Sequence, residues 1–186
     1  MTADSTIIQS EHLDLITMSP RFLEACLAGD GALATHILGC TVPPDWLHER
    51  WLMQLRLDQL RHNPDVQSWL LRGIALQAER TMIGHIGFHS SPGPDYLRDL
   101  APDGVELGYT IFPPFRRRGY ATEACAALMG WAQQVHHVQR FVLSISPTNV
   151  PSLRIAQHLG FRKVGTQIDE QDGPEDVFVR DLAPAN

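Results

Sequence analysis

Residues 105–132 read VELGYTIFPPFRRRGYATEACAALMGWA and join two different periodicities through a basic turn. Residues 105–111 alternate apolar side chains with Glu106, Gly108 and Thr110, which is typical of a strand with one apolar face. The residues that follow the turn repeat apolar side chains at helical spacing, at Ala121, Ala124, Cys125, Leu128, Ala132 and Val135. The stretch therefore predicts a strand, a turn rich in arginine and an amphipathic helix that packs on a sheet.

The turn itself predicts a site for an anion. Arg116, Arg117 and Arg118 carry three adjacent positive charges, which need either solvent or a negative partner. The N–H groups of the first helical turn have no partner within the helix, and the helix dipole adds positive potential there. Gly119 allows a ligand to approach the backbone closely, and Ala121 is nearly as small. Together these features favour phosphate or pyrophosphate, with a solvated turn as the alternative for so short a motif.

Composition limits the class of protein. The chain has 186 residues, 44% of them hydrophobic, and a net charge of -6. This length fits one domain over residues 1–186, with residues 1–7 expected as a flexible tail. The acidic balance argues against nucleic acid as a partner. No apolar run approaches the ~20 residues that span a bilayer, so we expect no membrane partner. For the oligomeric state we expect either a monomer or a homodimer.

Cysteine usage and the N-terminus indicate the compartment. The three cysteines, Cys26, Cys40 and Cys125, form no C-x-x-C pair, which favours thiols used as small apolar residues in a reducing environment. The first ten residues are polar and acidic and do not read as a secretory signal. We interpret the protein as cytoplasmic.

The flanking sequence predicts a mixed α/β architecture. We expect a strand at residues 12–19, a helix from Pro20 that Gly29 and Gly31 end, and a helix over residues 45–63. In that helix Asp45 would be the N-cap, and Leu47, Trp51, Leu55 and Leu60 would share one face. Residues 69–77 and 81–89 predict an antiparallel hairpin, and residues 90–104 a loop. A strand at 140–146, a helix at 151–161 ended by Gly160, and strands at 161–168 and 176–182 around an acidic turn follow.

Two motifs carry a resemblance to a known family. Residues 105–132 resemble the cofactor-binding core of the GNAT superfamily of N-acetyltransferases, whose signature here reads Arg116-x-x-Gly119-x-Ala121. Residues 146–161, SPTNVPSLRIAQHLGF, are similar to the family's N-x-x-S and L-G-F pattern, in step at Asn149, Ser152, Leu159, Gly160 and Phe161. The ELGY strand and the GYATEA helix start resemble the branch that includes ribosomal-protein N-terminal acetyltransferases. The chain contains no P-loop and no G-x-G-x-x-G motif.

The resemblance implies a fold and a co-substrate. The fold would be a twisted mixed sheet, flanked by helices, in which two central parallel strands at 105–112 and 140–146 splay apart. Acetyl-CoA would bind there, with its pantetheine arm against Ile111, Asn149 and Ser152. The main-chain N–H groups of residues 116–121 would hold the pyrophosphate; this cofactor set is Arg116, Arg117, Arg118, Gly119, Tyr120 and Ala121. No metal is implied.

The resemblance also implies direct transfer of acetyl to a primary amine, either a protein N-terminus, a small-molecule amine or an amine antibiotic. A lysine-like amine has a pKa near ~10.4 and must lose a proton before it attacks. Glu106 is the first candidate for that base, directly or through water; a solvated or salt-bridged strand glutamate is the equal alternative. His85 and His89 share a strand face and are rivals, although structural or surface roles are the commoner reading. A metal site on this pair lacks a third ligand.

One departure from the family pattern concerns the acid for the leaving thiolate. Many members carry a tyrosine seven residues after the motif asparagine, where this chain has Ala156. Ser152 is the substitute that we predict, and a capping role at its helix start is the alternative. The departure keeps open a second function, that of a non-catalytic acyl-CoA-binding sensor or interaction module. The binding site for the acceptor amine would be formed by residues 20–63 and 90–104. Four aromatic side chains could either line an apolar pocket there or belong to the core: Trp46, Trp51, Trp69 and Tyr96.

Overall fold

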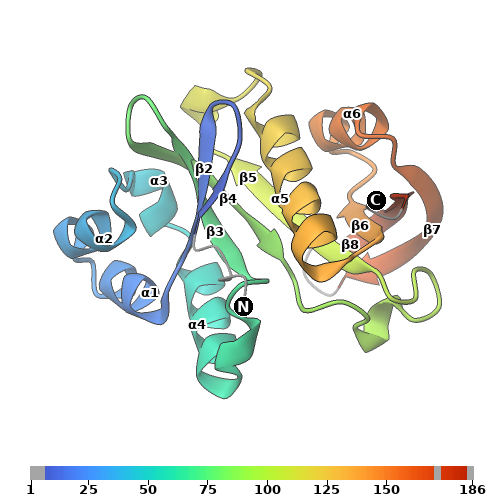
Figure 1. Ribbon diagram of the computed structural model, residues 1–186, viewed down its shortest axis with the longest axis horizontal. Coiled ribbons are helices and arrows are strands. Elements are labelled where there is room, and N and C mark those ends of the chain that lie inside the picture. The colour runs from blue at the N-terminus through green and yellow to red at the C-terminus, as the bar shows by residue number, and fades with distance from the viewer. Residues whose placement is uncertain (1–6, 170–172, 184–186) are drawn as a thin grey trace. The chain divides into compact units, whose positions relative to one another are not determined.

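The computed structural model describes residues 7–169 and 173–183 (Figure 1), which fall into two compact units. The first unit contains Met1–Gly87 and Tyr109–Ala127, and the second contains Phe88–Gly108 and Leu128–Asn186. Residues 1–6 of the predicted tail lie outside the described residues, whereas Ile7 already belongs to a strand. The single domain over residues 1–186 stays a prediction. Among the described helices, none combines the length and apolar character that crossing a bilayer requires.

The strands of the first unit pair antiparallel in chain order. They are β1 (Ile7–Gln9), β2 (Leu13–Thr17), β3 (Leu71–Leu76) and β4 (Thr81–Phe88). The register pairs Ile8 with Leu15 in β1 and β2, and Leu15 with Ile74 in β2 and β3. The hairpin of β3 and β4 that residues 69–89 predict is therefore confirmed.

Four α-helices follow β2 and precede β3: α1 (Pro20–Leu27), α2 (Gly31–Leu38), α3 (Pro44–Leu47) and α4 (Arg50–His62). The 3-10 turn η1 (Pro64–Val66) completes this segment. Ser19 caps α1 by accepting from the Phe22 N–H at 3.2 Å, and Asp30 caps α2 by accepting from the Leu33 N–H at 2.9 Å. The prediction that Gly31 ends a helix is wrong, because the Asp30 cap makes Gly31 the first residue of the next one.

The single helix predicted over residues 45–63 is also wrong, since the chain breaks between α3 and α4. Pro43, not Asp45, is the N-cap of α3, and His48 closes it. The break allows Trp46 to be fully buried while Met53, Leu57 and Leu60 of α4 are buried as well. Because the helical phase is reset, Trp51 is left 60% exposed, although the sequence pattern places it on the buried face.

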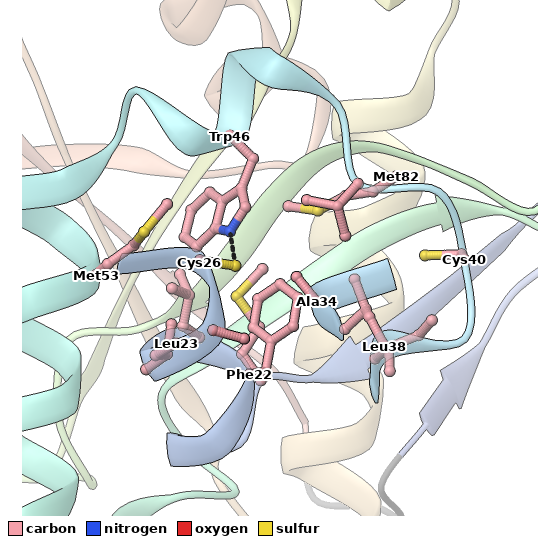
Figure 2. Close-up of a cluster of buried hydrophobic side chains, with 14 of the residues drawn as sticks. Phe22, Leu23, Cys26, Ala34, Leu38, Cys40, Trp46, Met53 and Met82 are labelled. Atoms are coloured by element: carbon pink, nitrogen blue, oxygen red, sulfur yellow. Dashed lines mark hydrogen bonds between the residues drawn. The ribbon is translucent and has the colours of Figure 1, made fainter. Parts of the chain in front are cut away.

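The helices cover the apolar core of the first unit (Figure 2). The Trp46 ring lies 6.3 Å from the Phe22 ring, and its indole N–H donates to the Cys26 sulfur at 3.3 Å. This hydrogen bond satisfies the one polar group of a buried tryptophan. Burial and this contact fit the expectation that the cysteines serve as small apolar residues; Cys26, Cys40 and Cys125 are all free and buried.

The second unit is built on a parallel pair and an antiparallel edge. Its elements are the 3-10 turn η2 (Asp95–Leu97), β6 (Arg140–Ile145), α6 (Val150–His158), β7 (Arg162–Asp169) and β8 (Gly173–Asp181). It also contains the first four residues of β5 (Val105–Ile111), whose last three belong to the first unit. Strand β6 pairs antiparallel with β8, and β8 with β7. A small core forms where the loop residues Leu97 and Ala101 pack against Val142, Val177 and Val179.

The strand order confirms the predicted fold class. Hydrogen bonds connect the strands as β1-β2-β3-β4-β5-β6-β8-β7, an eight-stranded mixed sheet with helices. Its one described parallel pair is β5 with β6, matched at Val105 with Phe141 and at Glu106 with Val142. After β5 come the 3-10 turn η3 (Pro113–Phe115) and α5 (Tyr120–His136), the helix that residues 105–132 predict.

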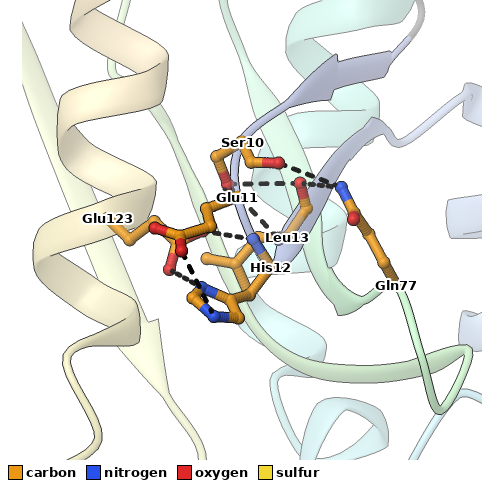
Figure 3. A network of polar contacts seen from close by, with 6 residues as sticks. All are labelled: Ser10, Glu11, His12, Leu13, Gln77 and Glu123. Carbon is orange, nitrogen blue, oxygen red and sulfur yellow. Dashed lines mark hydrogen bonds and ion pairs between the residues drawn. The ribbon is translucent and has the colours of Figure 1, made fainter.

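A polar network fixes the beginning of α5 to the turn between β1 and β2 (Figure 3). One Glu123 carboxylate oxygen accepts from the Ser10 hydroxyl and from the His12 N–H, both at 2.7 Å. The other lies 3.1 Å from His12 Nδ1. Gln77 extends the network by donating to the Ser10 carbonyl at 3.2 Å. Burial would raise the pKa of the Glu123 carboxyl, but these hydrogen bonds outweigh it and hold that pKa below its ordinary value of 4.5.

We predict that Glu123→Gln lowers the free energy of unfolding at pH 7 by about 1 kcal/mol, since it weakens charge-assisted hydrogen bonds. A depressed folded-state pKa means that this stabilisation is present above pH 4.5 and is lost as the pH falls through the folded value. Urea unfolding of both proteins from pH 7 into acid measures the difference, which should shrink on acidification.

The control is Glu24→Gln, which removes a surface carboxylate 2.9 Å from Arg61. We expect this change to cost less than about 0.5 kcal/mol, because exposed ion pairs contribute little. Equal losses for the two variants, or a Glu123→Gln loss that does not depend on pH, would contradict the role of the network.

Candidate functional site

The turn before α5 has the backbone geometry of an anion site. Arg116 is extended, with φ -68 and ψ 161, whereas Arg117 and Gly119 have positive φ values of 62 and 86. Alternation between extended or right-handed and left-handed residues turns successive N–H groups toward one side of the chain. The Glu123 N–H donates to the Gly119 carbonyl at 3.1 Å, so the intrahelical bonds begin there. The N–H groups of Tyr120, Ala121 and Thr122 precede that bond and have no acceptor within the helix.

Two of the three arginines brace the turn. Arg116 Nε donates to the Ile111 carbonyl at 2.8 Å, and an Arg118 terminal nitrogen donates to the Pro114 carbonyl at 3.2 Å. The Arg118 guanidinium also lies 6.0 Å from the centroid of the Phe115 ring. All three arginine side chains and Gly119 are exposed. The sequence places all three arginines at the anion site without requiring each to touch the anion, and the structure gives Arg116 and Arg118 contacts with main-chain carbonyls of the loop.

The second motif lies in the second unit, at the start of α6. Asn149 is the N-cap, and its side-chain oxygen accepts from the Ser152 N–H at 3.2 Å. The capping role considered for Ser152 therefore belongs to Asn149, and the half-buried Ser152 side chain lies in the first helical turn. Ala156 is fully buried, so the position where many family members carry a tyrosine belongs to the packed interior.

Glu106 is a buried, hydrogen-bonded carboxylate. Its side chain is only 4% exposed, and one oxygen lies 3.5 Å from His89 Nδ1. Burial would raise the pKa of the Glu106 carboxyl, but hydrogen bonds from His89, Ser144 and Tyr96 and the charge of His89 hold that pKa below its ordinary value. The alternatives to a catalytic role were a solvated and a salt-bridged strand glutamate. The structure excludes the solvated one and agrees with the salt-bridged one.

Further polar residues of the second unit support this carboxylate. The Ser144 hydroxyl accepts from the Gln167 side-chain amide at 3.0 Å, which leaves the Ser144 proton to donate to Glu106. The His89 N–H donates to the Glu106 main-chain carbonyl at 2.9 Å. Sequence reasoning did not find Ser144, Gln167 or the contact of Tyr96. The available signal was Ser144, a polar residue within the otherwise apolar strand at residues 141–145.

The two candidate histidines have different surroundings. His85, in the first unit, is 6% exposed and packs 5.2 Å from Trp46 and 6.3 Å from Phe112, measured between ring centroids. Burial, with a smaller contribution from the charge of Arg56, lowers the pKa of His85 to about 4. His85 is therefore a neutral core residue at pH 7, whereas the His89 side chain is 43% exposed. Within residues 7–169 and 173–183, no group of His, Cys, Asp and Glu could hold a metal ion.

The four aromatic residues considered for an acceptor pocket also differ in their exposure to solvent. Trp46 is fully buried in the core of the first unit, which is the core alternative of the two that the sequence left open. Trp69 is half-buried, whereas Trp51 is 60% and Tyr96 is 52% exposed.

Comparison with known sequences identifies a family. Residues 20–162 match the family described as acetyltransferase (GNAT) domain. A curated relative, the uncharacterized N-acetyltransferase YnaD of Bacillus subtilis (strain 168), is 28% identical over 92 residues. That alignment covers 50% of this chain and 49% of the relative, so the chain spans about half the length of the curated relative that it matches.

Comparison with solved structures supports the fold. Ribosomal-protein-S5-alanine acetyltransferase from Vibrio fischeri superposes with a TM-score of 0.62 at 13% identity, over 95% of this chain and 97% of that one. RimL, a ribosomal L7/L12 alpha-N-protein acetyltransferase solved in complex with coenzyme A, gives a TM-score of 0.62 at 16% identity, over 95% and 98%. These neighbours belong to the branch that the sequence motifs predict, and at such identity they show a shared fold.

We predict unequal responses to substitution at the two left-handed positions of the turn. A Cβ at Gly119 would meet no atom within 4 Å, so Gly119→Ala is penalised only by its positive φ, at about 1–2 kcal/mol of unfolding free energy. Arg117→Gly relieves comparable strain but loosens the unfolded chain, so we expect a net change within about 0.5 kcal/mol of zero. Urea unfolding measures both, and equal destabilisation would contradict the described backbone geometry.

Proposed function

Since this chain belongs to the GNAT family of acetyltransferase domains, we propose that it is an acetyl-CoA-dependent N-acetyltransferase. It moves the acetyl group from the thioester of acetyl-CoA to a primary amine by direct attack in a ternary complex. The observation that carries this proposal is the turn at residues 116–121, which presents helix N-terminal N–H groups beside exposed positive charge.

In this proposal the coenzyme's pyrophosphate binds the N–H groups of residues 116–121. Gly119 is exposed and a Cβ there would meet nothing within 4 Å, so the backbone is open to a ligand. Arg117 adds an exposed guanidinium, and Tyr120 and Ala121 contribute the first helical turn. The pantetheine arm would contact Ile111, Asn149 and Ser152. The Asn149 side-chain oxygen caps α6, and its amide N–H groups supply the donors that a pantetheine carbonyl needs.

The chemistry requires a proton acceptor for the amine and a proton donor for the thiolate. The pair of Glu106 and His89 supplies the acceptor, because it combines a buried negative charge with an exposed imidazole. The unprotonated amine attacks the acetyl carbon, the new C–N bond forms, and the C–S bond breaks. Ser152 gives its hydroxyl proton to the departing sulfur and recovers one from solvent. The products are the N-acetylated amine and free coenzyme A.

The acceptor class remains to be chosen by experiment between a protein N-terminus, a small amine and an amine antibiotic. RimL and the Vibrio fischeri enzyme are named for ribosomal-protein substrates. A matching substrate here is a peptide with a free N-terminus. A suitable panel therefore contains peptides that begin with alanine or serine, together with spermidine and an aminoglycoside.

Titration calorimetry with coenzyme A and release of free thiol from acetyl-CoA with each panel amine test the proposal. We expect saturable heat with the native chain and thiol release with at least one amine class. Heat without thiol release would favour the alternative function, a non-catalytic acyl-CoA-binding sensor, for which the buried Ala156 is the motivating feature. Absence of heat would contradict both.

A matched pair of variants locates the site. Gly119→Val places a branched side chain over the N–H groups and should weaken coenzyme A binding by at least tenfold, about 1.4 kcal/mol. Gly29→Val is the control, because Gly29 also has a positive φ (78) and open surroundings but ends α1, away from residues 116–121 in the chain. Equal affinity losses in the two variants would show that strain, and not the loop, is responsible.

A further inference from the structure

We propose that, within the pair of Glu106 and His89, it is His89 that takes the proton from the acceptor amine, and that Glu106 is a positioning residue. This inference rests on the proposed function. It assigns the base to a different residue from the one that the sequence motif favours, and it follows from contacts that lie wholly within the second unit.

Access separates the two residues. A general base must come within hydrogen-bond distance of the proton that it removes, or within one water of it. The Glu106 side chain is 4% exposed, whereas the His89 side chain is 43% exposed. An amine can reach the imidazole without displacing any part of the core, but it cannot reach the carboxylate directly.

The Glu106 carboxylate is also occupied. It accepts hydrogen bonds from His89, Ser144 and Tyr96, and Ser144 is in turn held by Gln167 at 3.0 Å. These donors favour the ionised carboxylate and make it a weak proton acceptor, in agreement with the direction of its pKa shift. A negative charge that is fixed in this way can instead orient and stabilise a neighbouring cation.

The contact between the two residues orients the imidazole. His89 Nδ1 lies 3.5 Å from a Glu106 carboxylate oxygen, so the carboxylate favours the tautomer that carries its proton on Nδ1. In that tautomer Nε2 has a lone pair and can accept a proton. Gly108 makes room for this nitrogen, because a Cβ at that position would lie 2.8 Å from His89 Nε2. The position of the His89 ring therefore explains on steric grounds why residue 108 is a glycine.

The proposed step balances without a further reagent. The N–H bond of the ammonium breaks, and its proton passes to His89 Nε2 to give an imidazolium. The amine keeps the electron pair with which it attacks the acetyl carbon of the thioester. The Glu106 carboxylate stabilises the imidazolium through Nδ1–H. The imidazolium then returns its proton to solvent, and the pair is restored.

Steady-state kinetics of His89→Ala and Glu106→Gln test this assignment, with acetyl-CoA and the panel amine that releases thiol fastest. For His89→Ala we expect kcat to fall by about 100-fold or more, with unchanged calorimetric affinity for coenzyme A. Added imidazole should restore part of this activity, because the truncated side chain leaves an exposed space. His137→Ala, which removes an exposed histidine just after α5, is the control and should leave kcat unchanged.

Glu106→Gln should reduce kcat less than His89→Ala does. It should also move the acidic limb of the profile of kcat/KM against pH to lower pH, because removal of an adjacent anion disfavours the protonated imidazole. Gly108→Ala should lower kcat without changing the affinity for coenzyme A, since it displaces the ring and leaves both polar residues in place.

The outcomes separate this inference from the proposed function. If the native chain neither binds coenzyme A nor releases thiol, the proposed function fails. If the native chain is active but His89→Ala keeps a kcat within about threefold, or loses activity that imidazole does not restore, the inference is overturned. A Glu106→Gln loss that equals or exceeds that of His89→Ala overturns it as well, and assigns the base to Glu106.

Discussion

The structure depends on how α5 begins after the turn that follows β5. The first N–H groups of α5 have no acceptor within the helix, and the arginine side chains of the preceding turn, which are donors only, give them none. The Arg116 contact with the Ile111 carbonyl, at 2.8 Å, holds the turn, and Gly119 adopts the left-handed conformation that starts the helix. This arrangement leaves donors and positive charge at one exposed point, and it gives the family motif of this chain its physical meaning.

A second constraint applies to the buried charge of Glu106. A carboxylate removed from water is costly unless donors surround it, and this one has three side-chain donors in the second unit. Tyr96 comes from the long loop before β5, whereas Ser144 comes from β6, farther along the chain. The same contacts that stabilise the charge also limit its reactivity, and this is why the exposed partner, His89, is the better proton acceptor.

Local patterns predicted the elements whose periodicity is regular, and failed where tertiary packing decides. Alternation located β3, β4 and β5, and helical spacing located α5. The break between α3 and α4 escaped prediction because it serves the burial of Trp46, which no local pattern records. The support of Glu106 by Ser144 and Gln167 was equally hidden, since it requires the register of strands that are far apart in sequence.

The most direct test of the central claim is amide hydrogen exchange at residues 116–121, with and without coenzyme A. The account predicts that saturating coenzyme A slows exchange at Tyr120 and Ala121, because their N–H groups gain phosphate acceptors that the helix cannot provide. Exchange rates at these residues that remain unchanged while coenzyme A binds would show that the anion lies elsewhere and would contradict the account.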